Sequence, residues 1–194
     1  MTLVPELESI RKQMEQINSE ASQLCAGLSE AQLAWRRDST RWSIAENLVH
    51  LSVTANVFLP SIDESIADAR RRHLFADGPF SLGMAGKFYV WYVKPPVRVR
   101  LRAPKPLKPL LQGSASQALA QFLRAQERIL QRVEAANGLD LQRATWSSPL
   151  ATFIRMNLLT IFSVCTGHER RHLWQAQNVR RQLLSASGAA NSAS

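Results

Sequence analysis

Apolar residues recur at spacings of three and four along the first part of the chain, and this repeat constrains the fold more than any other feature. The positions are Leu3, Leu7, Ile10, Met14, Ile17, Ala21, Leu24 and Leu28. Residues spaced in this way share one face of an α-helix and form the apolar seam of a helical bundle. We therefore predict a bundle helix over about residues 5–28, which the helix-breaking residues Gly27 and Ser29 end.

A second helix is predicted over residues 44–72, because it has both a marked start and an apolar face. Ser43 and Glu46 have the spacing of a capping box, in which each side chain accepts the backbone N–H of the other residue. Pro60 lies inside this segment, and we expect it to kink or interrupt the helix because its ring displaces a backbone hydrogen bond.

Two later segments complete a set of four long helices. The third helix is predicted over residues 116–136, and the fourth, which is apolar nearly all round in its first half, over residues 152–183. Residues 73–114, rich in Gly and Pro, form a connection long enough to join two parallel helices. The sequence thus predicts an all-α four-helix bundle of up-up-down-down-like order, with a long crossover between helices 2 and 3.

Two pieces of local structure are expected within the crossover. We expect a short helix over residues 82–93. Residues 97–102 alternate apolar and basic side chains, which predicts an extended arm lying on the bundle. Contact with a dinucleotide or with a membrane is the alternative role of this arm.

The chain is expected to form one domain followed by a short tail. At 194 residues it is long enough to bury a core without disulfides or structural zinc. Residues 185–194 contain only Ser, Ala, Gly and Asn, which bury too little apolar surface to offset the entropy of ordering. We therefore assign residues 1–184 to the bundle domain and predict a disordered tail.

The charge and cysteine content restrict the class of partner. A net charge of +9 would suit an anionic partner of any kind. The basic residues, however, are spread along the chain and form no nucleic-acid-binding motif. Cys25 and Cys165 lie in apolar helical patterns, not in a disulfide framework. The first residues lack a basic-then-apolar pattern, so we expect no leader segment. The longest apolar stretch is shorter than the ~18–20 residues of a membrane span. We expect a soluble cytoplasmic protein that acts on a small molecule.

His168 and His172 stand four residues apart in the predicted fourth helix, so their imidazoles project from one face. Such a pair can bind a divalent ion such as zinc or nickel, if a third ligand is supplied and water fills an open position. With Glu169 between them, they also match the H-E-x-x-H pattern of zinc peptidases, whose glutamate activates the metal-bound water. Residues 173–194 contain no His, Asp or Glu, so any third protein ligand is expected upstream.

A second histidine motif lies early in the chain, where Trp42–Ser43 is followed by Glu46 and by His50–Leu51. Together with H-[DE]-x-x-H-x-x-Q near the end, this arrangement resembles the DinB-like superfamily of metal-binding four-helix bundles. The resemblance covers about residues 21–181, with a poorly matched middle third. It implies a metal held by three histidines, at the matching positions His50, His168 and His172.

The resemblance also implies classes of reaction. Family members with known activity include metal-dependent thiol S-transferases and the mycothiol-dependent maleylpyruvate isomerase type, while most members have no assigned reaction. Our leading hypothesis is a transferase that binds a low-molecular-weight thiol, with Gln175 and Arg171 as candidate cofactor-binding residues. The alternatives are a metal-dependent hydrolase with Glu46 or Glu169 as its base, and a non-catalytic metal-binding or dimerisation module, in which case a homodimer is expected.

Several of these residues also have a purely structural interpretation. Capping alone explains Glu46, and Gln175 has the character of an ordinary amide on a helix surface. Cys165 precedes His168 by three residues on the same face, and we expect it to be a buried apolar side chain. A role for Cys165 as a metal ligand or attacking thiol is the alternative.

Overall fold

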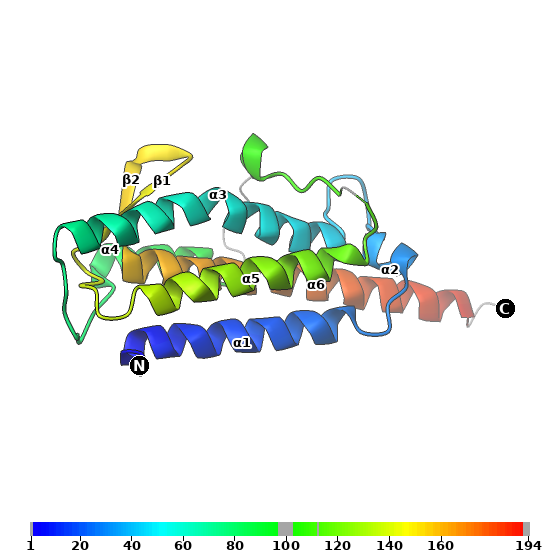
Figure 1. The fold of residues 1–194 in the computed structure, drawn as a ribbon. Coiled ribbons are helices and arrows are strands. Elements are labelled where there is room, and N and C mark those ends of the chain that lie inside the picture. Colours follow the sequence, from blue (N-terminus) through cyan, green and yellow to red (C-terminus); the bar gives the residue numbers. More distant parts are fainter. Residues whose placement is uncertain (1, 97–102, 112, 192–194) are drawn as a thin grey trace.

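Four long helices lie side by side in the computed structural model of the chain, which describes residues 2–96, 103–111 and 113–191 (Figure 1). They are α1 (Pro5–Cys25), α3 (Ile44–Arg71), α5 (Gln117–Ala135) and α6 (Leu158–Asn191). Each occupies a segment for which the apolar repeat predicts a helix. The all-α four-helix bundle with its long crossover is therefore confirmed.

Side-chain contacts define the directions of the helices. Asn56 and Asp63 of α3 accept hydrogen bonds from Arg128 (2.7 Å) and Arg132 (2.8 Å) of α5, respectively, so these two helices run the same way (Figure 1). Helix α1 runs against them and parallel to α6. The order is thus up-down-down-up. The second and third long helices are parallel, as the long crossover predicts, while the predicted up-up-down-down order is wrong. The connection from α1 to α3 contains the short α2 (Glu30–Ala34) and joins neighbouring ends of two antiparallel helices (Figure 1).

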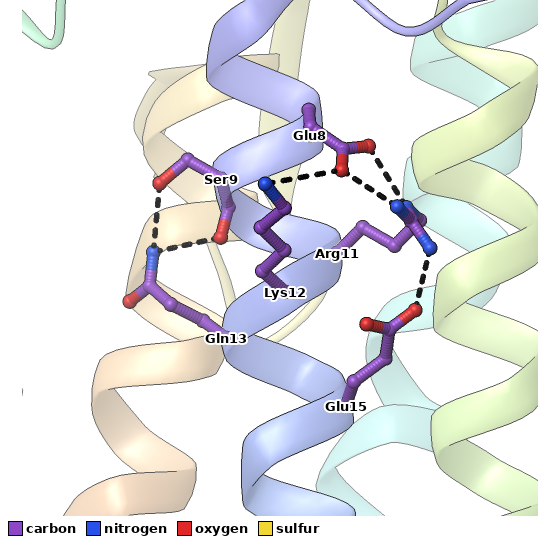
Figure 2. A network of polar contacts seen from close by, with 6 residues as sticks. All are labelled: Glu8, Ser9, Arg11, Lys12, Gln13 and Glu15. Carbon is purple, nitrogen blue, oxygen red and sulfur yellow. Dashed lines mark hydrogen bonds and ion pairs between the residues drawn. The ribbon is translucent and has the colours of Figure 1, made fainter.

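The packing of α1 follows directly from its sequence. Pro5 suits the first helical turn, and Glu6 and Glu8 favour the positive end of the helix dipole. The outer face carries a polar network in which Arg11 pairs with Glu8 and Glu15, both at 2.6 Å (Figure 2). Such pairs contribute about 0.2–0.5 kcal/mol each, so burial of the seam dominates the stability of α1. The buried residues are Leu7, Ile10, Met14, Ile17, Ala21 and Leu24.

Helix α3 begins with the predicted capping box. The Oγ of Ser43 accepts the backbone N–H of Glu46 (3.1 Å), and Oε2 of Glu46 accepts the backbone N–H of Ser43 (2.9 Å). The helix then continues through Pro60, so this proline does not interrupt it. Residues 43–52 are all buried, which places the polar side chains of this stretch inside the bundle.

The crossover contains two short helical elements. Helix α4 (Gly83–Val93) matches the predicted short helix, and a 3-10 turn, η1, spans Lys105–Leu107. The arm predicted at residues 97–102 lies outside the described residues.

Two glycines allow α4 to approach α6 closely. A Cβ added at Gly86 would lie 2.6 Å from Oγ1 of Thr160, and one added at Gly167 would lie 2.9 Å from Cγ2 of Val93. Both distances are shorter than a carbon atom tolerates. A larger side chain at either position would require the facing side chain or the helix itself to shift.

A β-hairpin precedes α6, and the sequence analysis missed it. Strands β1 (Thr145–Ser148) and β2 (Ala151–Asn157) pair antiparallel, so the predicted start of the fourth helix at Thr152 is wrong. Trp146 anchors the hairpin: it is 2% exposed and its Nε1–H donates to Oγ of Ser61 (2.7 Å).

The start of α6 is determined by a polar cap. Oδ1 of Asn157 accepts the backbone N–H of Thr160 (2.8 Å), which is the hydrogen bond that an N-cap asparagine makes to the first turn of a helix. The helix continues to Asn191, beyond residue 184. The domain boundary at 184 and the disorder of residues 185–194 stay predictions. Within the described part of the chain, no helix combines the length and the apolar character that crossing a membrane requires.

Candidate metal centre

Three histidines from two antiparallel helices point their Nε2 atoms toward one another. Nε2 of His168 lies 3.4 Å from Nε2 of His50 and 3.1 Å from Nε2 of His172. Across the described residues, these three form the only group of at least three His, Cys, Asp or Glu side chains whose ligand atoms converge, all within 4.8 Å. His73, which follows the end of α3 with a φ of 51°, is not in the group.

The outer ring nitrogens of two of these histidines bind protein oxygens. Nδ1 of His50 lies 2.6 Å from the carbonyl oxygen of Leu107, and Nδ1 of His172 lies 3.0 Å from Oδ1 of Asn47. Asn47 is itself oriented, because its Nδ2 donates to the carbonyl of Ser43 (2.8 Å). Carbonyl oxygens only accept hydrogen bonds, so the proton of each imidazole is assigned to Nδ1. This tautomer leaves a lone pair on Nε2, which faces the centre of the group.

This donor set fits a divalent metal ion. In the assigned tautomers, the Nε2 lone pairs of His50 and His172 point toward Nε2 of His168. A cation between the three nitrogens would be stabilised by these lone pairs. Nitrogens bound at ~2.0–2.1 Å to a tetrahedral ion lie about 3.3–3.4 Å from one another. Nε2 of His168 lies at similar distances, 3.4 Å and 3.1 Å, from Nε2 of His50 and of His172. Three imidazoles occupy three of four tetrahedral positions, so the fourth would remain for a substrate atom or water.

Burial keeps the three imidazoles neutral. Burial lowers the pKa of His50, and the hydrogen bond to Leu107 raises it by a smaller amount. Burial lowers the pKa of His168 to about 3, with further lowering by His50 and Arg171. Burial likewise holds the pKa of His172 well below its usual value. Neutral imidazole is the form that binds metal, so metal binding at neutral pH would not require these rings to lose a proton.

Trp42 covers one side of the histidine group. Its ring centroid lies 4.7 Å from that of His50 and 5.7 Å from that of His172, with the second pair stacked at 28°. A large aromatic ring in this position excludes water from the imidazoles and limits their rotation. Trp42 lies just before the N-cap of α3, so the start of this helix determines its position.

The two glutamates singled out by the sequence bind other groups. Oε1 of Glu46 accepts from Arg36 (2.6 Å), while its Oε2 serves the capping box. Glu169 is 5% exposed, and its Oε2 accepts from Nε2 of Gln126 (3.3 Å). Burial raises the pKa of Glu169 to about 8. Glu169 and His168 both line a cavity of about 10 Å³, which is about the size that one water needs.

The candidate cofactor-binding residues lie beside the histidines. Gln175 lies one helical turn after His172, and its side chain has a small effect that raises the pKa of His172. Arg171 is close enough to lower the pKa of His168 and His172 by its charge, after the larger effects of burial and of the neighbouring histidines. Cys165 instead packs against the apolar core, and burial raises the pKa of its thiol, which favours the structural interpretation of this residue.

Sequence reasoning did not identify three parts of this site. Asn47 precedes His50 by three residues on the same helix, and this spacing is the signal that could have revealed it. Trp42 was read as part of a motif and not as a covering ring. The carbonyl of Leu107 left no signal, because any residue type supplies a backbone carbonyl.

Comparison with known proteins agrees with this architecture. A family model described as the DinB superfamily matches residues 13–176. The fold is similar to the solved structure of YfiT from Bacillus subtilis, described as a probable metal-dependent hydrolase with an unusual four-helix bundle topology. The TM-score is 0.60 at 12% identity, over 94% of this chain and 91% of that chain, so the likeness concerns the fold alone. No curated protein sequence matches the chain.

Proposed function

The chain belongs to the DinB superfamily, and from this premise we propose that it is a divalent-metal-dependent enzyme that transfers a low-molecular-weight thiol to a small electrophile. The observation that carries the proposal is the convergence of three neutral imidazoles with no carboxylate in the group, within the described chain. Such a site binds a metal and leaves one position for the reacting ligand.

The positions of the glutamates favour a thiol over water as the nucleophile. A bound divalent cation would lower the pKa of a thiol or water that it coordinates. Water attack usually needs a positioned base as well, and a base must reach the proton that it accepts. Both oxygens of Glu46 are engaged by the capping box and Arg36. Burial raises the pKa of Glu169 to about 8, so this carboxyl is mostly protonated, and a poor base, at neutral pH. A thiolate, already deprotonated, attacks without such a base.

The residues beside the histidines suit the rest of a thiol cofactor. Arg171 supplies a guanidinium that can bind a carboxylate, and Gln175 supplies an amide that can both donate and accept hydrogen bonds. In the transfer step, the thiol sulfur bonds to carbon, the leaving group departs with its electron pair, and the thiol proton passes to solvent.

The test uses cobalt-loaded protein titrated with glutathione, bacillithiol and mycothiol. We expect at least one thiol to produce a sulfur-to-cobalt charge-transfer band and to be consumed with a halogenated arene, releasing halide. His50→Ala should lose both the band and the turnover, while His73→Ala should keep them. Absence of the band with every thiol would contradict the transferase.

A metal-dependent hydrolase is the second candidate, and Glu169 is the observation that favours it. With a pKa raised to about 8 and a cavity shared with His168, this carboxyl can exchange a proton near neutral pH. Ester hydrolysis that needs no thiol, and that is lost in both His50→Ala and Glu169→Gln, would favour this reaction. Inactivity in both assays, with metal bound, would favour a non-catalytic module.

A further inference from the structure

Helix α4 turns an apolar face toward solvent. Met84, Phe88 and Trp91 are 90%, 58% and 51% exposed, and their spacing of four and three residues places them on one face. Gly86 and Val90, on the opposite face, are buried. A surface helix normally presents polar residues outward, so this face is an exception that needs an explanation.

The close contacts with α6 hold this face outward. Gly86 packs against Thr160, and Gly167 of α6 packs against Val93, at separations that leave no space for a Cβ. Rotation of α4 about its axis would replace Gly86 with a larger side chain at the tight contact. The rings of the outer face also form a cluster, with centroids 5.9 Å apart for Phe88 and Trp91, and 6.3 Å apart for Phe88 and Tyr92.

The charge around this face favours an anionic surface over a second copy of the chain. Lys87 is exposed at the edge of the face, Lys94 stands at the C-terminal end of α4, and the helix contains no acidic residue. A two-fold contact between copies would bring like charges together on proteins that each carry a net charge of +9. Anionic lipid headgroups would complement the same charges.

We propose that α4 is an interfacial docking helix, which lies flat on an anionic lipid surface. Its Met84, Phe88 and Trp91 side chains enter the headgroup region, where aromatic residues are favoured, while Lys87 binds lipid phosphate. Docking of this kind is peripheral, in agreement with the absence of a membrane-spanning helix among the described residues. It extends beyond the proposed reaction and does not depend on the metal.

The test is sedimentation of the whole protein with vesicles of phosphatidylcholine alone, or mixed with phosphatidylglycerol. We expect binding to the mixed vesicles that weakens with added salt, and much weaker binding to the neutral ones. Met84→Ser combined with Phe88→Ser should reduce binding to the mixed vesicles about tenfold or more. Lys87→Glu should reduce it as well. Phe153→Ser, on strand β2 at an equally apolar side chain that is 85% exposed, is the matched control and should bind as the unmodified chain does.

Several outcomes would overturn the docking helix. These are no binding to mixed vesicles, equal binding to both vesicle types, and an equal loss in the Phe153 control. A dimer in sedimentation velocity that only the Met84/Phe88 variant dissociates, without vesicle binding, would assign the face to a second copy. Circular dichroism and metal content should remain unchanged in every variant. A failure of the docking proposal can therefore be distinguished from a failure of the proposed enzyme activity.

Discussion

Asn47 holds His172 in the tautomer whose Nε2 lone pair faces the other two histidines. Its Oδ1 lies 3.0 Å from Nδ1 of His172, and its Nδ2 is tied to the carbonyl of Ser43 at the N-cap of α3. The amide therefore cannot rotate to offer its donor without breaking a buried hydrogen bond. Asn47 thus links the start of α3 to the histidine group.

Replacement of this amide should weaken metal binding without unfolding the protein. Loss of such an outer hydrogen bond typically reduces metal affinity about 10–100-fold, which we expect for Asn47→Ala. Asn47→Asp keeps an acceptor for Nδ1–H and should lose much less. A chelator competition assay measures both, and equal affinity in Asn47→Ala and the unmodified chain would show that the contact does not orient the ring.

The three histidines should each be required for metal binding. His50→Ala, His168→Ala and His172→Ala each remove one Nε2 atom from the group, and we expect bound metal to fall sharply in all three. His73→Ala lies outside the group and is the control. Elemental analysis of the purified proteins provides the measurement, and equal metal content in all four variants would exclude the site.

Removal of the metal should lower stability but leave the bundle folded. A ligand that binds only the native state adds about 2.7 kcal/mol when present at a hundredfold excess over its dissociation constant. The two apolar clusters of the core do not include the histidines, so chelated protein should keep its helical circular dichroism and melt at a lower temperature. Complete unfolding on chelation would indicate a structural metal instead.

The sequence predicted the helices well because burial on one face leaves a repeat of three and four residues. The same repeat carries no direction, which explains why the up-up-down-down order was wrong although each long helix lies in a predicted segment. The hairpin before α6 was missed for a related reason. Thr152, Phe153 and Ile154 continue the apolar run of the helix, and the contact between Trp146 and Ser61 that holds the hairpin joins distant parts of the chain.

The site divides in the same way between local and distant features. The spacing of His168 and His172 is local, so it could be read directly, and His50 was added through the family resemblance. The partner of His50 is a carbonyl that lies 57 residues away, and only the fold brings the two together. The structure places the three histidines in one group, while binding of metal to them stays a prediction.

The close contact between α4 and α6 gives a stability prediction. Gly167→Ala would place a Cβ 2.9 Å from Cγ2 of Val93, a stiff β-branched side chain. Overpacking costs about 1–3 kcal/mol, against which alanine regains about 1 kcal/mol of helix propensity, so we expect a net loss of up to about 2 kcal/mol. Adding Val93→Ala should recover part of this loss in urea unfolding of chelated protein. A double variant no more stable than Gly167→Ala would exclude the clash.

The stability of metal-free protein should fall toward both acid and alkaline pH, for different reasons. The pKa of His168 is lowered to about 3 in the folded chain, so the unfolded chain binds more protons once the pH falls below 6.5. Stability contributed by this histidine is present above pH 6.5 and is lost as the pH falls toward 3. Glu169 acts in the opposite sense, since its raised pKa makes the folded chain the better proton acceptor between pH 4.5 and about 8.

Glu169→Gln isolates the alkaline part of this dependence. The stability that Glu169 contributes is fully present below pH 4.5 and is lost as the pH rises through about 8, because folded protein must then ionise a buried carboxyl. Glutamine keeps an acceptor for Gln126 and carries no charge, so the variant should lose less stability than the unmodified chain between these pH values. Each unit of pKa shift corresponds to about 1.4 kcal/mol, which makes the difference measurable by urea unfolding of chelated protein. Parallel pH profiles for the two proteins would mean that Glu169 ionises freely, and would remove the observation that favours the hydrolase.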